Sequence, residues 1–237
     1  MILTLLAPRS AEHQPILVGL LIKYVQSVRV ERCMIVDLDL QARWTQQILR
    51  SSDKRVSGTA ETIGDLFSAW SGGRSRPRLK TVEVRSHLLV PGTLHLEDLG
   101  QRIHEGAEKR GYAISVTAYL KDALLDACPD TAQCPIILIC GYGLHPIARV
   151  AAAISDQIVV AVESLDFGDI EFGRVDAAQF VGASRSKQVR MWIHRTDPTT
   201  EDRVKCRELG IHIRLPATPN APAPDIIARA GHVLLPY

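Results

Sequence analysis

Two acidic residues in this sequence could do chemistry. Asp37 and Asp39 follow an apolar run and are separated by a single leucine, in the segment RCMIVDLD. Carboxylates at the end of a buried strand could activate a water molecule and contact a magnesium ion. They could equally cap and pair with groups nearby in the chain. The two residues alone leave both roles open.

Cysteine and histidine indicate less. Cys140 lies in the apolar run CPIILICG near His145, but no third group orients that histidine, so we expect a packed thiol and not a nucleophile. The eight histidines show no HExxH or other metal-ligand spacing, so no metal site is expected. The five cysteines include no CxxC pair and mostly lie in apolar runs, which indicates reduced, buried thiols in a cytoplasmic protein.

Composition favours one ordinary globular unit. A chain of 237 residues can form a single domain over residues 1–237 with a sizeable core. Its net charge of +2 is too small to require nucleic acid as a partner. The start MILTLLA has no basic segment before it and is too short to span a bilayer, so we expect a first strand and no stable membrane span.

Short apolar runs alternate with longer amphipathic ones, which predicts an α/β fold with a doubly wound, mostly parallel sheet flanked by helices. Strands are predicted at residues 2–6, 33–38, 81–90, 136–140, 158–162, 189–194 and 211–215. Helices are predicted at residues 15–28, 44–51, 60–70, 96–109, 116–127, 146–154, 167–182, 201–209 and 225–230. Ligands of such sheets bind where the strands end, so function is expected in the loops that follow the strands.

Four segments, taken in order, carry a resemblance to a known family. RCMIVDLDLQARWTQQIL is similar to a strand that ends in Asp-x-Asp-x-Gln, with Asp37, Asp39 and Gln41 at those positions. GTAETIGDLFSAW is similar to the helix that follows, and HLLVPGTLHLEDLG to a strand that runs into a Pro-Gly turn. PIILICGYGLHPIARVAAAISDQIVVAVES is similar to a Walker B strand with its following helix and strand, with Asp156 at the usual aspartate. Together they resemble the ParA/MinD family, deviant Walker ATPases that position plasmids, chromosomes, division sites and secretion machinery. The resemblance implies a P-loop NTPase-like fold.

The phosphate loop departs from the family. Its pattern Lys-Gly-Gly-x-Gly-Lys-Thr-Thr falls on the segment RSAEHQPI. Ser10, Ala11 and His13 replace glycines and lose the freedom to turn backbone N–H groups toward phosphate. Gln14 replaces the second lysine without its charge. Pro15 replaces the threonine that would bind magnesium, and it has neither a hydroxyl nor an N–H, although it suits the first turn of a helix.

Three further positions bear on nucleotide binding. Cys140 falls where the Walker B aspartate would hold magnesium through water, and His194 where the family often has an asparagine that contacts adenine. Arg9 falls on the first lysine, which in the family acts across a dimer on the partner's phosphates. An ion pair between Arg9 and Asp39 would fill the emptied loop. Asp37 and Asp39 complete this degenerate nucleotide site, and Asp39 is the candidate catalytic residue.

The resemblance and its departures predict a pseudo-ATPase that binds or positions a protein partner in partition, pilus, secretion or polysaccharide-export machinery. A homodimer is expected and no cofactor, with ATP and magnesium only if the degenerate loop still binds them. One alternative is an active ATPase that uses Arg9 and Asp39 unconventionally. Another is a partition factor that binds DNA without ATP. In that case DNA phosphates would contact the basic side chains of a turn-rich segment, Arg74, Arg76, Arg78 and Lys80. The other interpretation of this segment is a solvated loop that binds no DNA.

Overall fold

In the computed structural model of this chain, the described residues are 1–7, 32–50, 62–84, 87–94, 96–110, 113–131, 133–142, 145–162, 188–193, 204 and 213–214. The strands are β1 (Ile2–Ala7), β2 (Met34–Asp37), β3 (Val82–Val84), β4 (His87–Val90), β5 (Ile136–Tyr142), β6 (Gln157–Val162), β7 (Gln188–Ile193) and β8 (Ile213–Arg214). They form one eight-stranded sheet in the order β3-β4-β2-β5-β1-β6-β7-β8. All pairs are parallel except β3 with β4. The predicted α/β class with a mostly parallel sheet is confirmed.

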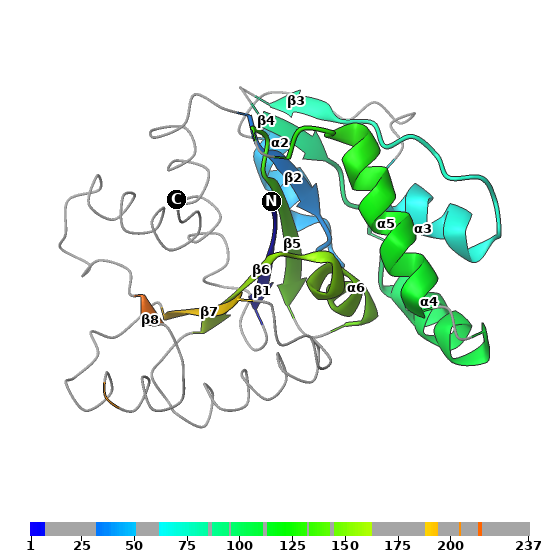
Figure 1. Ribbon diagram of the computed structural model, residues 1–237. Helices are drawn as coiled ribbons and strands as arrows, with labels where there is room; N and C mark the ends of the chain where they lie inside the picture. Colours follow the sequence, from blue (N-terminus) through cyan, green and yellow to red (C-terminus); the bar gives the residue numbers. More distant parts are fainter. Residues whose placement is uncertain are drawn as a thin grey trace.

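Several helices lie together on one side of this sheet. The helices are α2 (Arg43–Arg50), α3 (Ile63–Ser71), α4 (Leu96–Arg110), α5 (Ala113–Ala127) and α6 (Pro146–Ile154). Figure 1 shows α3, α4, α5 and α6 grouped on the same side of the sheet. Their apolar side chains pack on the central strands, where Phe67, Leu120 and Ile147 join Leu138 in one buried cluster. The helical layer therefore supports the sheet, and the sheet positions the loops that follow its strands.

The central position of β5, between β2 and β1, explains why its sequence is apolar without alternation. All five residues from Ile136 to Cys140 are at most 1% exposed. Successive side chains of a strand point to opposite faces, so both faces of β5 are covered. The prediction of near-continuous hydrophobic strands is confirmed for this part of the sheet.

The prediction of a single strand over residues 81–90 is wrong. Val82 pairs with Leu89 and Val84 with His87, so the chain reverses and β3 runs antiparallel to β4. The segment TVEVRSHLLV contains no glycine, proline or asparagine to mark a reversal. Pairing of β4 with β2 selects which part becomes the inner strand, and this information is not local.

Helix starts are set by capping. The predicted helix over residues 60–70 begins instead at Ile63, because Thr62 and Asp65 form a capping box. The Asp65 side chain accepts from the Thr62 N–H at 2.6 Å, and the Thr62 hydroxyl accepts from the Asp65 N–H at 3.4 Å. The helices predicted at 15–28, 167–182 and 225–230 lie outside the described residues, as does nearly all of 201–209.

Within the described residues, no helix combines the length and apolar character that crossing a bilayer requires.

Candidate functional site

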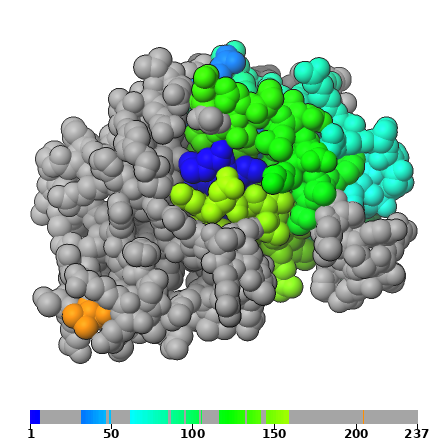
Figure 2. Space-filling view, in the orientation of Figure 1, coloured from blue at the N-terminus to red at the C-terminus, as the bar shows by residue number. Residues whose placement is uncertain are grey.

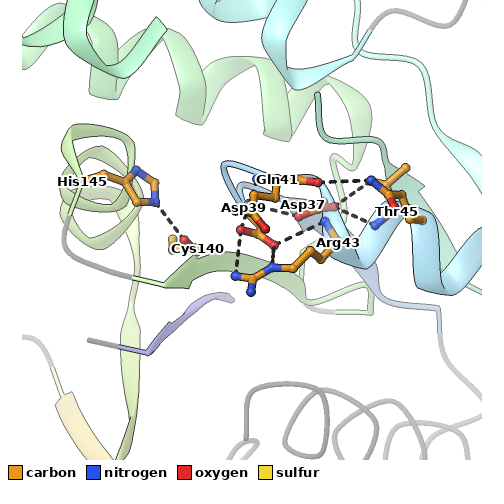
Figure 3. Close-up of polar contacts among 8 residues, drawn as sticks. Asp37, Asp39, Gln41, Arg43, Thr45, Cys140 and His145 are labelled. Atoms are coloured by element: carbon orange, nitrogen blue, oxygen red, sulfur yellow. Dashed lines mark hydrogen bonds and ion pairs between the residues drawn. The ribbon is translucent and has the colours of Figure 1, made fainter. Parts of the chain in front are cut away.

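The carboxyl ends of three neighbouring strands meet at one edge of the sheet. In the pairing register, Asp37 of β2 lies level with Ile139 of β5, and Val36 lies level with Val90 of β4. The loops that follow these strands are therefore brought together. Figure 3 shows the polar side chains gathered there, with the two carboxylates next to the start of α2.

Asp37 is fully buried and each of its oxygens accepts a hydrogen bond. Oδ1 accepts from the Asp39 N–H at 3.0 Å. Oδ2 accepts from the Thr45 N–H at 2.7 Å and from the Thr45 hydroxyl at 2.8 Å. The Thr45 N–H is one of the donors that the first turn of α2 leaves without a helical partner. Asp37 therefore caps α2 from the end of β2.

Thr45 extends this network to the loop after β4. Its hydroxyl accepts from the Gly92 N–H at 2.8 Å while donating to Asp37. A Cβ on Gly92 would lie 2.9 Å from the Asp37 carbonyl oxygen and 3.0 Å from its carboxylate. Only glycine leaves room for this approach. The Pro-Gly turn in the sequence thus corresponds to a backbone that lies directly against Asp37.

Asp39 is 1% exposed and forms an ion pair with Arg43. The Arg43 Nε donates to Oδ2 at 2.5 Å and a terminal guanidinium nitrogen donates to Oδ1 at 3.1 Å, a two-pronged contact. The backbone N–H groups of Arg43 and Gln41 also point to this carboxylate, at 3.3 and 3.4 Å. Ala42 completes the turn with φ of 49°, which is rare for a residue with a Cβ.

Gly141 makes room for Asp39. The register between β1 and β5 shifts after Leu5, and Gly141 adopts φ of 65° in this irregular part of β5. A Cβ at this position would lie 2.4 Å from Oδ1 of Asp39 and 2.8 Å from its Cγ. Glycine is therefore required both for the backbone conformation and for the buried carboxylate.

Cys140 and His145 lie beside the two carboxylates without forming a catalytic pair. His145 is the N-cap of α6, where its Nδ1 accepts from the Ala148 N–H at 3.3 Å. Its Nε2–H donates to the carbonyl oxygen of Cys140, and not to the thiol, at 2.8 Å (Figure 3). Burial, with the nearby charges of Asp37 and Asp39, raises the pKa of Cys140 far above the ordinary range of a thiol. The expectation of a packed thiol is confirmed.

Folding changes the protonation of Asp37. Burial raises its pKa from 3.8 to about 7, although the hydrogen bonds from Thr45 and Asp39 oppose this rise. Between these two pH values the folded chain holds a proton that the unfolded chain has lost. The stability that this proton contributes is complete below pH 3.8 and is lost as the pH rises through about 7.

We therefore expect the free energy of unfolding to fall by on the order of 2 kcal/mol more in the wild type than in Asp37→Asn between pH 5 and 8. Urea titrations at several pH values measure this difference. His145 acts in the opposite direction, because burial lowers its pKa below 6.5, so its contribution is lost as the pH falls. Subtracting the Asp37→Asn curve removes the His145 effect, and parallel curves for the two proteins would contradict the assignment.

Magnesium does not fit the described residues of this edge. The ion prefers several oxygen ligands in octahedral geometry. Both oxygens of Asp39 are bonded to Arg43, and both oxygens of Asp37 accept from groups within the site. Cys140 offers a buried sulfur where the resemblance places an aspartate. The sequence left two roles open for the carboxylates. In the described residues Asp37 caps α2 and Asp39 pairs with Arg43, which corresponds to the capping and pairing role.

The phosphate-loop residues of the resemblance lie outside the described residues, as does His194. Arg9 also lies outside the described residues, so its pairing with Asp39 stays a prediction, and within the described residues Asp39 pairs with Arg43. Sequence reasoning missed Arg43, Thr45 and Gly141. Arg43 could have been found, because an acid and an arginine four residues apart at a helix start are a recognisable pair.

The basic segment after α3 is partly engaged. Arg76 bonds to Asp126 of α5 at 2.6 Å and to Asp122 at 3.3 Å, and it lies over the ring of Tyr119. Two acidic side chains thus share the surface that was considered for DNA phosphates. Arg74 and Arg78 are exposed. DNA binding by the segment from Arg74 to Lys80 remains a prediction.

No protein-family model and no curated protein sequence matches this chain. Solved structures do. A plasmid partition protein from Borrelia burgdorferi has a TM-score of 0.63 at 13% identity, covering 98% of this chain and 95% of its own. The Borrelia burgdorferi B31 protein BB_S35, crystallised with AMPPNP, has a TM-score of 0.67 at 12% identity and covers 99% and 97%.

An enzyme shares the same architecture. Cobyrinic acid a,c-diamide synthase from Mycobacterium smegmatis, with a bound ATP analogue and magnesium, has a TM-score of 0.57 at 17% identity and covers 96% of this chain and 89% of its own. At these identities the likeness concerns the fold. The sheet order, the place of the Asp-x-Asp turn after β2 and these neighbours agree: the chain has the fold of the ParA/MinD type of P-loop proteins.

Proposed function

We propose that the chain is a ParA/MinD-like pseudo-ATPase, a protein that recruits or positions a protein partner without nucleotide chemistry. Partition, pilus, secretion and polysaccharide-export machineries are the settings in which such a partner would be found, with the chain acting as a homodimer. The partition proteins among its structural neighbours support this direction. Because one fold hosts many functions, the proposal depends on the site.

The observation that carries the proposal is the closure of Asp39 by Arg43. Asp39 is buried, and each of its two oxygens accepts a hydrogen bond from the Arg43 guanidinium, a bidentate contact. A carboxylate held in this way has little capacity left for a metal ion or a water molecule. Asp37 is likewise committed to the start of α2 through Thr45. The edge that serves nucleotides in other P-loop proteins is used here to fasten a helix to the sheet.

The substitutions in the sequence point the same way. Pro15 and Gln14 remove a hydroxyl and a positive charge that nucleotide chemistry would use, and Cys140 removes a carboxylate. These changes affect two separate segments, the phosphate loop and strand β5. ATP hydrolysis is hard to reconcile with the joint loss of the hydroxyl, the positive charge and the carboxylate. The ion pair of Asp39 and the helix cap of Asp37, by contrast, preserve the fold.

Calorimetric titration of the wild type with ATP, ADP and magnesium is expected to give no magnesium-dependent binding tighter than about 1 mM. The same titration of Arg43→Ala tests whether opening Asp39 restores a site, and none is expected because the phosphate loop lacks its own groups. Arg78→Ala, which removes an exposed arginine elsewhere, is the matched control.

Two results would overturn the proposal. One is micromolar, magnesium-dependent ATP binding by the wild type. The other is ATP turnover that disappears in Asp39→Ala, which would favour an active ATPase with an unconventional site. Turnover that is indifferent to Asp39→Ala points to a contaminating enzyme and leaves the expected absence of activity standing.

A further inference from the structure

Three cysteines and a histidine meet at the opposite edge of the sheet. Cys33 precedes β2, His87 begins β4, Cys134 lies just before β5 and Cys128 follows α5. Since β4, β2 and β5 are parallel neighbours, their amino-terminal ends come together. Figure 2 shows the N-terminal segment, in blue, at the surface between green and yellow-green segments. All three cysteines are free thiols in the structure.

The three thiols differ in what they can reach. Cys33 is fully buried, and its sulfur lies 3.1 Å from Nδ1 of His87. Burial raises the pKa of Cys33 to about 12. The Cys128 thiol instead donates to the carbonyl oxygen of Cys134 at 3.5 Å. Cys33 is therefore sealed and partnered, whereas Cys128 and Cys134 belong to one short turn.

A pocket gives access to this turn. Its volume is about 390 Å³, and Cys128 and Cys134 line it together with Arg32, Leu88 and Asp130. Cys33 is not among the lining residues. A small solute that enters the pocket therefore meets these two thiols.

The turn between the cysteines is held by backbone bonds. The Cys128 N–H donates to the Leu124 carbonyl at 2.9 Å, which ties it to the end of α5. The Cys134 N–H donates to the Asp130 carbonyl at 2.9 Å, and the Met1 amino group donates to the Thr131 carbonyl at 2.9 Å. A disulfide between two thiols six residues apart would close a short loop, which costs little chain entropy.

No set of three or more histidine, cysteine, aspartate or glutamate side chains among the described residues is arranged to hold a metal ion. Cys128 and Cys134 are only 5% and 9% exposed, and the pocket is the route by which a solute could reach them, so the chemistry open to this pair is thiol–disulfide exchange within the pocket. We propose that Cys128 and Cys134 form a site that reacts with small disulfides of the glutathione type, which enter through the pocket and leave an intramolecular disulfide. This inference is independent of the proposed function, because it concerns the other edge of the sheet.

The exchange has two steps. The Cys128 thiolate attacks one sulfur of glutathione disulfide, forming a mixed disulfide and releasing one glutathione thiolate. The Cys134 thiol then loses its proton to solvent and attacks the Cys128 sulfur, which releases the second glutathione. The two cysteines lose two electrons and two protons, and one glutathione disulfide becomes two glutathione molecules. Burial raises the pKa of Cys134 to about 12, so this thiol stays protonated until it gives up its proton in the second step.

The test is incubation of the full chain with glutathione disulfide at pH 8, followed by peptide mapping under non-reducing conditions. We expect one disulfide between Cys128 and Cys134, with Cys33 and Cys140 still reduced. Cys134→Ser is expected to stop at a glutathione adduct on Cys128, and Cys128→Ser is expected to form neither product at a comparable rate. Circular dichroism of each variant verifies that it is folded.

Two outcomes would overturn the inference. One is that Cys128 and Cys134 both stay reduced in the folded chain while the urea-unfolded chain is oxidised under the same conditions. The other is modification of Cys33 or Cys140 at the same rate as the pair, which would mean that reaction occurs only through unfolding. In either case the nucleotide titrations of the proposed function are unaffected.

Discussion

Gly141→Ala is expected to lower the free energy of unfolding by about 3 kcal/mol. Part of the loss comes from the backbone, because Gly141 has φ of 65°, where a residue with a Cβ is strained. The remainder comes from the carboxylate of Asp39, which the new Cβ would approach to 2.4 Å. Asp39 would have to move, and its contact with Arg43 would be disturbed. Urea denaturation followed by circular dichroism measures the loss.

Gly73→Ala is the matched control for this prediction. Gly73 has a similar φ of 62°, but a Cβ there would meet nothing within 4 Å. We expect this variant to lose only about 1 kcal/mol, the cost of the backbone conformation. Equal losses in the two variants would show that the approach to Asp39 has no energetic consequence.

The second large effect is expected from Thr45→Val, which should lose about 2 kcal/mol at pH 8. Valine has nearly the shape of threonine but has no hydroxyl. The Gly92 N–H then loses its acceptor, and buried Asp37 loses a donor. Because that hydrogen bond opposes the rise in the pKa of Asp37, its removal should raise this pKa further. Thermal and urea unfolding at two pH values measure both consequences.

The loss in Thr45→Val should be smaller at pH 5 than at pH 8. At the lower pH Asp37 holds its proton, and a neutral carboxyl is less dependent on donors than a buried charge. Thr45→Ser keeps the hydroxyl and should retain most of the stability at both values. A loss of equal size at pH 5 and pH 8 would argue against a charged Asp37 in the folded chain at pH 8.

Much of the architecture could be predicted from local sequence patterns. The apolar runs at residues 2–6, 136–140 and 158–162 are strands at nearly those limits, and the helix predicted at 146–154 has those bounds. The first two of these strands are buried on both faces, and the helix carries a clear cap. Continuous apolar runs and capping residues can both be recognised in the sequence. The reversal within residues 81–90 is not visible, because no glycine, proline or asparagine marks it in the sequence.

The candidate site was only half predictable. The sequence by itself determined which residues end the strands, and so placed Asp37, Asp39 and Cys140 at one edge of a parallel sheet. Tertiary structure decided what those residues do there. Thr45 and Arg43 reach the carboxylates because α2 begins directly above them, and Gly141 leaves the space that Asp39 fills. Such contacts depend on the register of neighbouring strands and on side-chain volume in three dimensions, neither of which is written in the spacing of residues along the chain.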